Sequence, residues 1–171
     1  MVHDDILHLS DLNLAGFIRE MTLWNRDGEI IEQDDLLMTH RPGASPITNA
    51  MIRLDRTTGR PVGDIISQAR AFYASRKSGF SVHIRKHLDA ELETACQNEN
   101  MLQISDAPGM IIDRPIPDEA LPPQVEVRQV TDDAGVSDFA AVAVDSYQSL
   151  GMPAAIGSKI FMSHGRCLKP Y

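Results

Sequence analysis

The sequence lacks the residues that several classes of protein require. It has only two cysteines, Cys96 and Cys167, and no CxxC pair, which excludes a disulfide framework and argues against a structural zinc site. No apolar run approaches the ~20 residues that span a bilayer. The acidic start MVHDDILHLSDLN has neither the basic nor the apolar part of a signal peptide. These absences predict a cytoplasmic protein that holds no metal and does not enter a membrane.

Positive charge is also scarce. The chain has 16 lysines and arginines against 24 aspartates and glutamates, a formal net charge of −8. Nucleic acids and anionic membranes are bound by basic surfaces, so neither is an expected partner. The 43% hydrophobic and 23% charged fractions are typical of a globular protein. A length of 171 residues allows one domain and part of a second.

The apolar pattern predicts alternating helices and strands. Apolar residues three and four apart predict helices, and alternating apolar residues predict strands. The predicted helices are 10–24, 64–77, 88–98, 133–150 and 158–163. The predicted strands are 29–32, 36–39, 49–54, 80–85, 101–105, 110–113 and 125–130. Ser10 or Asp11 is expected to cap the first helix, Phe17 to lie on its apolar stripe, and Gly79 to end the second helix in a left-handed conformation.

Four prolines crowd the stretch 114–124, where neither a helix nor a strand ladder can continue. This stretch therefore predicts a semi-rigid linker. The expected division is a first domain over 1–114, a linker over 115–124 and the opening segment of a second unit over 125–171.

The predicted order of elements is helix, hairpin, strand, loop, helix, strand, helix and two closing strands, and it resembles the GNAT N-acetyltransferase superfamily. The block FYASRKSGFSVHIRKHLDAELETACQNENMLQISDAPGMIIDRP is similar to the amino-terminal half of tandem GNAT proteins. The proline-rich linker followed by VEVRQV is similar to their entry into the second half. The resemblance implies an α/β fold with a GNAT-like mixed central sheet flanked by helices. It also implies an incomplete second GNAT-like unit, whose own acyl-CoA site would lie beyond Tyr171.

The resemblance also implies a site for acetyl-CoA. The family's phosphate loop reads Gln or Arg, two residues, Gly, one residue, then Gly or Ala, and the matching stretch here reads RTTGRP. Arg56 and Gly59 fit this pattern, but Pro61 has no amide hydrogen to donate to a phosphate. The residues expected at the phosphates are Arg56, Gly59, Arg60 and Gly63. The alternative is an ordinary turn between a strand and a helix.

Acyl transfer to an amine needs one group to accept the amine proton and another to reprotonate the thiolate. The tyrosine that GNAT enzymes often use for the second task matches a position close to Cys96, which is more simply a small buried hydrophobe. His83 and His87 are four apart but fall on different elements, which favours a surface pair over a metal site. His83 is expected to face away from the apolar residues of its strand, where it could line a substrate cleft. The catalytic residues stay unassigned.

Three functions are compatible with these observations. The first, by resemblance, is a GNAT-like N-acetyltransferase that transfers an acyl group from acyl-CoA to a small-molecule amine, in a truncated form that is weak or inactive alone. The second is a non-catalytic scaffold or dimerisation module, in which the apolar stripe of the helix over 133–150 pairs in a homodimer. The third is a domain that senses CoA or another small molecule.

Overall fold

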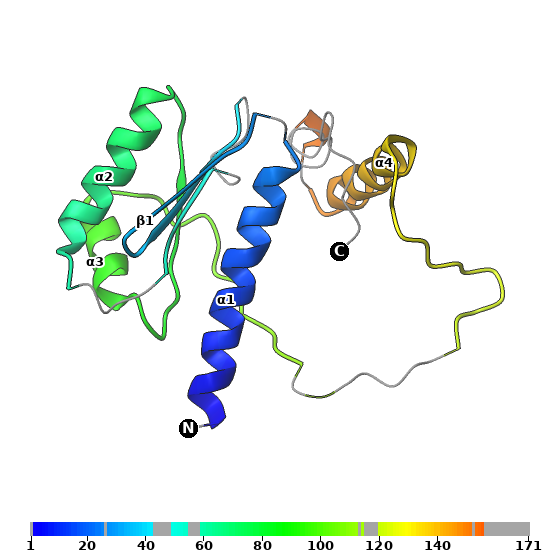
Figure 1. The fold of residues 1–171 in the computed structure, drawn as a ribbon, viewed down its shortest axis with the longest axis horizontal. Helices are drawn as coiled ribbons and strands as arrows, with labels where there is room; N and C mark the ends of the chain where they lie inside the picture. Colours follow the sequence, from blue (N-terminus) through cyan, green and yellow to red (C-terminus); the bar gives the residue numbers. More distant parts are fainter. Residues whose placement is uncertain are drawn as a thin grey trace.

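A computed structural model describes residues 2–25, 27–42, 49–54, 59–112, 114, 120–151 and 153–155. Within these residues the chain forms four helices and one four-stranded mixed sheet, an α/β arrangement (Figure 1). The elements are α1 (Val2–Leu23), β1 (Glu29–Gln33), β2 (Leu36–His40), β3 (Ala50–Arg53), α2 (Val62–Ser75), β4 (Ser81–His83), α3 (Ala90–Asn98) and α4 (Asp133–Ser149).

The sheet has the strand order β1-β2-β3-β4. β1, β2 and β3 are antiparallel neighbours, whereas β3 and β4 are parallel and are joined by α2. The hairpin predicted over 29–39 is confirmed. Its turn contains Asp34 with φ of 57°, in the left-handed region that tight hairpin turns need. Asp and Asn tolerate this region better than other residues with side chains.

The sheet is covered on both faces, as Figure 1 shows, with α2 and α3 on one side and α1 on the other. α2 places four residues of one helical stripe into the core because they recur at helical spacing. These residues are Ile65, Ile66, Ala69 and Tyr73. Leu36, Met38 and Met51 meet this stripe from the sheet. Leu37 and Ile52 point to the opposite face, where they pack with Ala15 and Ile18 of α1.

The first helix differs from its predicted form. It begins at Val2 rather than Ser10, so Ser10 and Asp11 lie inside it and cannot cap it. No proline or glycine interrupts residues 2–9, so the backbone can continue as helix towards the N-terminus. Phe17 is predicted on the apolar stripe, but its side chain is exposed, whereas Ile18 of the same stripe is buried together with Ala15. The prediction for Phe17 is wrong because the side of α1 that packs on the sheet is rotated by one residue from the predicted stripe.

The end of α2 also differs. Lys77, with φ of 51°, takes the left-handed position that the sequence predicts for Gly79. The amides of Lys77 and Ser78 donate to the carbonyls of Ala74 and Tyr73, which satisfies the last turn of the helix. The glycine is therefore not the residue that ends this helix.

Three predicted strands are not strands in the described chain. The stretches 101–105, 110–112 and 125–130 have no strand partner, and their larger apolar side chains are mostly exposed. Alternating apolar residues show that a segment can lie on a sheet, but a strand exists only where a neighbour completes the ladder. Residue 113 and the helix predicted over 158–163 lie outside the described residues.

α4 matches its prediction closely, ending one residue before the predicted boundary. Asp132 caps it, because its Oδ1 accepts a hydrogen bond from the Gly135 amide at 2.7 Å. The described residues between α3 and α4 form no helix or strand, and α4 lies away from the sheet (Figure 1). Of the proline-rich linker, residues 115–119 lie outside the described part of the chain.

Candidate functional site

The loop between β3 and α2 lies at the carboxyl ends of the two parallel strands. α2 crosses from β3 to β4, so this loop opens beside the point where the two strands end. In open α/β sheets ligands commonly bind outside the carboxyl ends of parallel strands. The loop predicted from sequence therefore occupies a position suited to a ligand. Residues 55–58, and with them Arg56, lie outside the described part of the chain.

Both predicted glycines face open space. Gly59 has φ of 63°, and a Cβ atom at Gly59 or Gly63 would meet no atom within 4 Å. Pro61 precedes α2 and no side chain caps the first turn of that helix. The first-turn amides of a helix carry partial positive charge, which favours an anion. Asp64 in the same turn opposes this by adding a negative charge.

The guanidinium group of Arg60 is already engaged by neighbouring polar side chains. Its Nη2 donates a hydrogen bond to Gln68 Oε1 at 2.6 Å. Its Nη1 lies 3.4 Å from Asp35 Oδ1 and 3.5 Å from Asp34 Oδ2. Two carboxylates of the β1–β2 turn thus offset the charge that was expected to meet a phosphate.

Asp35 links this loop to the core. Its side chain is fully buried, and its Oδ2 accepts a hydrogen bond from Arg53 Nε at 3.0 Å. Its carbonyl oxygen accepts the Leu54 amide at 2.6 Å. A buried carboxylate between two guanidinium groups is stable only while both cations stay in place. The hairpin turn and the end of β3 are therefore fixed relative to each other.

His83 lies at the end of β4, where the parallel pairing stops. It is opposite Ile52, so its side chain is on the α1 face of the sheet. Its neighbours Val82 and Ile84 pack on the α2 face, which confirms that His83 faces away from them. Burial lowers the pKa of the His83 imidazole, because an uncharged ring is easier to bury. A neutral imidazole at this place can accept a proton.

His87 does not join His83 in a metal site. Its Nε2 lies 3.1 Å from Asp11 Oδ2, and the same oxygen lies 3.3 Å from Arg85 Nη1. Arg85 is held in turn by Asp89, with Nε 2.8 Å from Oδ2. This cluster attaches α1 to the segment between β4 and α3. Among the residues that the structure describes, no group of three or more histidines, cysteines, aspartates or glutamates is placed to hold a metal ion.

Cys96 is part of the core between α2 and α3, packed in the same cluster as Leu92 and Tyr73. Burial raises the pKa of its thiol, which keeps it protonated and unreactive. The interpretation of Cys96 as a small buried hydrophobe is confirmed.

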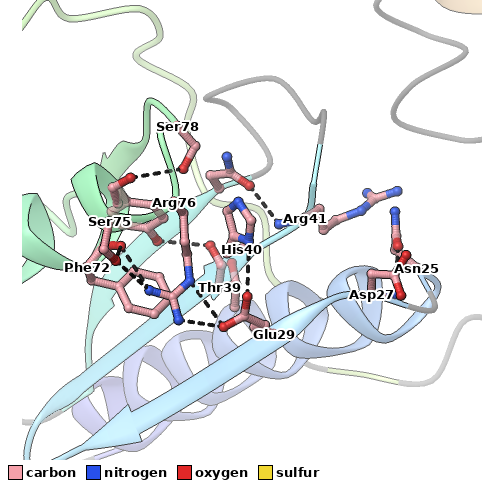
Figure 2. Close-up of polar contacts among 12 residues, drawn as sticks. Asn25, Asp27, Glu29, Thr39, His40, Arg41, Phe72, Ser75, Arg76 and Ser78 are labelled. Carbon is pink, nitrogen blue, oxygen red and sulfur yellow. Dashed lines mark hydrogen bonds and ion pairs between the residues drawn. The ribbon is translucent and has the colours of Figure 1, made fainter.

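A second polar cluster, not identified from the sequence, lies at the opposite end of the sheet (Figure 2). Glu29 and His40 are opposite each other in the β1–β2 ladder, with His40 Nδ1 3.5 Å from Glu29 Oε1. Arg76 donates to Glu29 Oε2 from Nε at 3.1 Å and from Nη2 at 2.5 Å. The guanidinium carbon of Arg76 is 3.8 Å from the Phe72 ring centroid. Hydrogen bonding from Arg76 lowers the pKa of the Glu29 carboxyl.

This second cluster joins elements rather than presenting groups to a substrate. His40 is only 6% exposed, so a substrate has little access to its ring. Arg76 attaches the end of α2 to the start of β1, across 47 positions of sequence. Figure 2 shows the Arg41 side chain directed towards Asn25 and Asp27, away from Glu29. Glu29 and His40 lie opposite each other because of the register of the β1–β2 hairpin. This pairing is the one contact of the cluster that follows from a local sequence pattern.

No helix of the described chain combines the length and the apolar character that crossing a membrane requires. Comparison with known proteins finds no matching family model and no significant similarity to a curated protein or to a solved structure.

Proposed function

We propose that this chain is a GNAT-like module that binds acyl-CoA at the β3–α2 loop and has weak or no acyl-transfer activity alone. The observation that carries the proposal is the sheet: an antiparallel β1-β2-β3 followed by a parallel β4, with α2 as the connection. The family resemblance implies a mixed central sheet, and this arrangement supports the proposal to that extent.

The residues of the loop fit coenzyme A in part. Gly59 and Gly63 leave open space at the start of α2, where a pyrophosphate would approach backbone amides. Arg56 and Arg60 would supply positive charge. Asp34, Asp35 and Asp64 would oppose it, and Arg60 is already paired with the first two. This balance supports weak binding rather than tight binding.

The groups near the ends of the strands support slow acyl transfer. His83 is the described histidine at the carboxyl end of a parallel strand, and its lowered pKa leaves it free to accept the proton of an attacking amine. Reprotonation of the CoA thiolate needs a second group, and the matching position is occupied by the buried Cys96. A chain that has the proton acceptor but not the proton donor should bind acyl-CoA and transfer its acyl group only slowly.

An amide NMR titration with acetyl-CoA tests the proposal. We expect the largest shifts at Gly59, Arg60 and Gly63, with smaller shifts at His83 and none at Gly135 of α4. Gly63→Ala should weaken acetyl-CoA binding and so reduce these shifts, because the added methyl group occupies the open space at the start of α2. Gly16→Ala is the matched control, since a methyl group added at Gly16 would also meet no atom within 4 Å but would lie on α1. Shifts confined to α4, or no shifts at millimolar ligand, would contradict the proposal.

A further inference from the structure

Three side chains from outside the β3–α2 loop hold the guanidinium group of Arg60. Its Nη2 donates a hydrogen bond to Gln68 Oε1 at 2.6 Å, the shortest of these contacts. Its Nη1 lies 3.4 Å from Asp35 Oδ1 and 3.5 Å from Asp34 Oδ2. Short hydrogen bonds are directional, whereas ionic attraction at 3.4–3.5 Å is less so. Gln68 therefore fixes where the guanidinium lies, and the two carboxylates balance its charge.

Gln33 sets the orientation of the Gln68 amide. Gln68 Nε2 donates to Gln33 Oε1 at 3.3 Å, so the amide oxygen of Gln68 is directed to Arg60. Arginine is only a donor, so the reverse orientation of this amide would place two donors against each other. Gln33 is the last residue of β1, and Gln68 belongs to α2. The strand and the helix together thus define one position for the guanidinium.

This position is on the flank of α2 and not in front of its first turn. Gln68 is six residues after Val62, the first residue of α2, or about 9 Å along the helix axis. The open space at Gly63 and the partial positive charge of the helix lie at its amino-terminal end. Arg60 directly precedes that end, and its side chain is 22% exposed. A rotation of the Arg60 side chain can therefore bring its charge to the start of α2 without opening the core.

We propose that Arg60 is a movable phosphate ligand, which Gln68 holds on the flank of α2 until the pyrophosphate of an acyl-CoA attracts it to the start of the helix. The inference rests on the proposed function for the identity of the ligand. Pyrophosphate oxygens are charged acceptors, whereas the Gln68 amide is neutral, so the exchange favours the ligand. Gln68 is then a positioning residue that weakens binding, because its hydrogen bond to Arg60 must break first.

NMR relaxation of the Arg60 Nε–Hε group tests the held position in the free chain. This group should be restrained in the wild type and should become mobile on the picosecond-to-nanosecond timescale in Gln68→Met. Methionine has a helix propensity close to that of glutamine but is only a weak acceptor. Gln97→Met, at an exposed glutamine of α3, is the matched control and should leave Arg60 restrained. Equal restraint in the wild type and in Gln68→Met would overturn the proposal, since the carboxylates alone would then hold Arg60.

Calorimetric titration with inorganic pyrophosphate and with acetyl-CoA tests the movement. Gln68→Met should bind pyrophosphate about threefold to tenfold more tightly than the wild type, because a partly exposed hydrogen bond to a charged group no longer has to break. Adding Gln68→Met to Arg60→Met should give no such gain, because only a released Arg60 produces it. The proposal fails if Gln68→Met does not bind pyrophosphate more tightly, or if the gain persists without Arg60.

The two ligands separate this inference from the proposed function. Tighter binding of both pyrophosphate and acetyl-CoA by Gln68→Met would support both. Tighter binding of pyrophosphate, with no binding of acetyl-CoA by any variant, would support the movable Arg60 and contradict the proposed function. Circular dichroism of each variant checks that the fold is retained, which is expected because Gln68 lies outside the core.

Discussion

Arg60 lies against Asp35, with its Nη1 3.4 Å from Oδ1, and Asp34 stands beside the same guanidinium at 3.5 Å. The contact joins the turn of the β1–β2 hairpin to the loop that leads into α2. It means that the cation best placed to bind a phosphate is already engaged by two carboxylates. Affinity for an acyl-CoA should therefore depend on Asp34 and Asp35 as much as on Arg60.

Asp34→Asn should strengthen acetyl-CoA binding. Asparagine tolerates the left-handed backbone of Asp34, so the turn is kept while one negative charge beside Arg60 is removed. The pair is partly exposed, and such pairs contribute up to about 1 kcal/mol, which corresponds to a gain in affinity of about fivefold at most. Calorimetric titration measures it, with Asp145→Asn on α4 as a control for net charge. Equal affinities in both variants would mean that Asp34 does not influence the loop.

Asp35→Ala should destabilise the fold strongly. Removing this carboxylate leaves Arg53 buried without its 3.0 Å ion-pair partner, and breaking a buried ion pair costs roughly 3–5 kcal/mol. Urea unfolding of Asp35→Ala and of Asp34→Asn gives the comparison, since Asp34 is more than half exposed and its change should cost less than about 1 kcal/mol. Similar midpoints for the two variants would show that Asp35 is not the residue that fixes the turn.

Tyr73 should not ionise while the protein is folded. Its hydroxyl lies 2.9 Å from the Thr39 carbonyl oxygen and 2.8 Å from that of Ala50, and burial raises its pKa. A raised pKa means that the folded state holds the proton more tightly than the unfolded state. Stability from this group is therefore complete below the ordinary tyrosine pKa of about 10 and is lost as pH rises above it.

Ultraviolet absorbance titration checks the Tyr73 prediction. The curves of the wild type and of Tyr73→Phe should coincide until alkali unfolds the protein, and only then should the extra tyrosine absorb. If the wild type gains the additional tyrosinate signal near pH 10 with its circular dichroism unchanged, Tyr73 is not buried as described.

Gly28→Ala should destabilise the protein, because a Cβ atom there would overlap the carbonyl oxygen of Thr22. That carbonyl belongs to the backbone at the end of α1 and cannot move without disturbing the turn into β1. We expect a loss of roughly 2 kcal/mol or more. Gly16→Ala, in the middle of α1 with open space around it, should instead stabilise by about 0.5–1 kcal/mol. Thermal unfolding of the two variants should therefore shift in opposite directions.

Local sequence patterns correctly predict those helices and strands that are determined by their own residues. The β1–β2 hairpin follows from two apolar runs around the Asp34–Asp35 turn, and α4 follows from its apolar period and its Asp132 cap. The stretches 101–105 and 125–130 have the same kind of strand pattern but no partner in the described chain. Sequence alone shows that a face is apolar, whereas the neighbour that completes a ladder comes from the whole fold.

The position of the candidate site could be predicted from the sequence, but the pairing of Arg60 with the carboxylates beside it could not. The strand–loop–helix order located the β3–α2 loop, and the alternation of β4 predicted the direction of His83. The pairing of Arg60 with Asp35 joins residues 25 positions apart, and it exists only because the hairpin turn folds onto this loop. The Glu29–Arg76 contact was missed for the same reason, since it spans 47 positions.

A thermal-shift titration of the chain with acetyl-CoA tests the central claim most directly, with dephospho-CoA as the control for the phosphate contribution. A ligand at about 100 times its dissociation constant stabilises a protein by about 2.7 kcal/mol, which raises the unfolding midpoint by several degrees. We predict a saturable rise that Arg56→Ala and Gly63→Ala both reduce and that Gly16→Ala preserves. An unchanged midpoint at millimolar acetyl-CoA would contradict acyl-CoA binding by this chain.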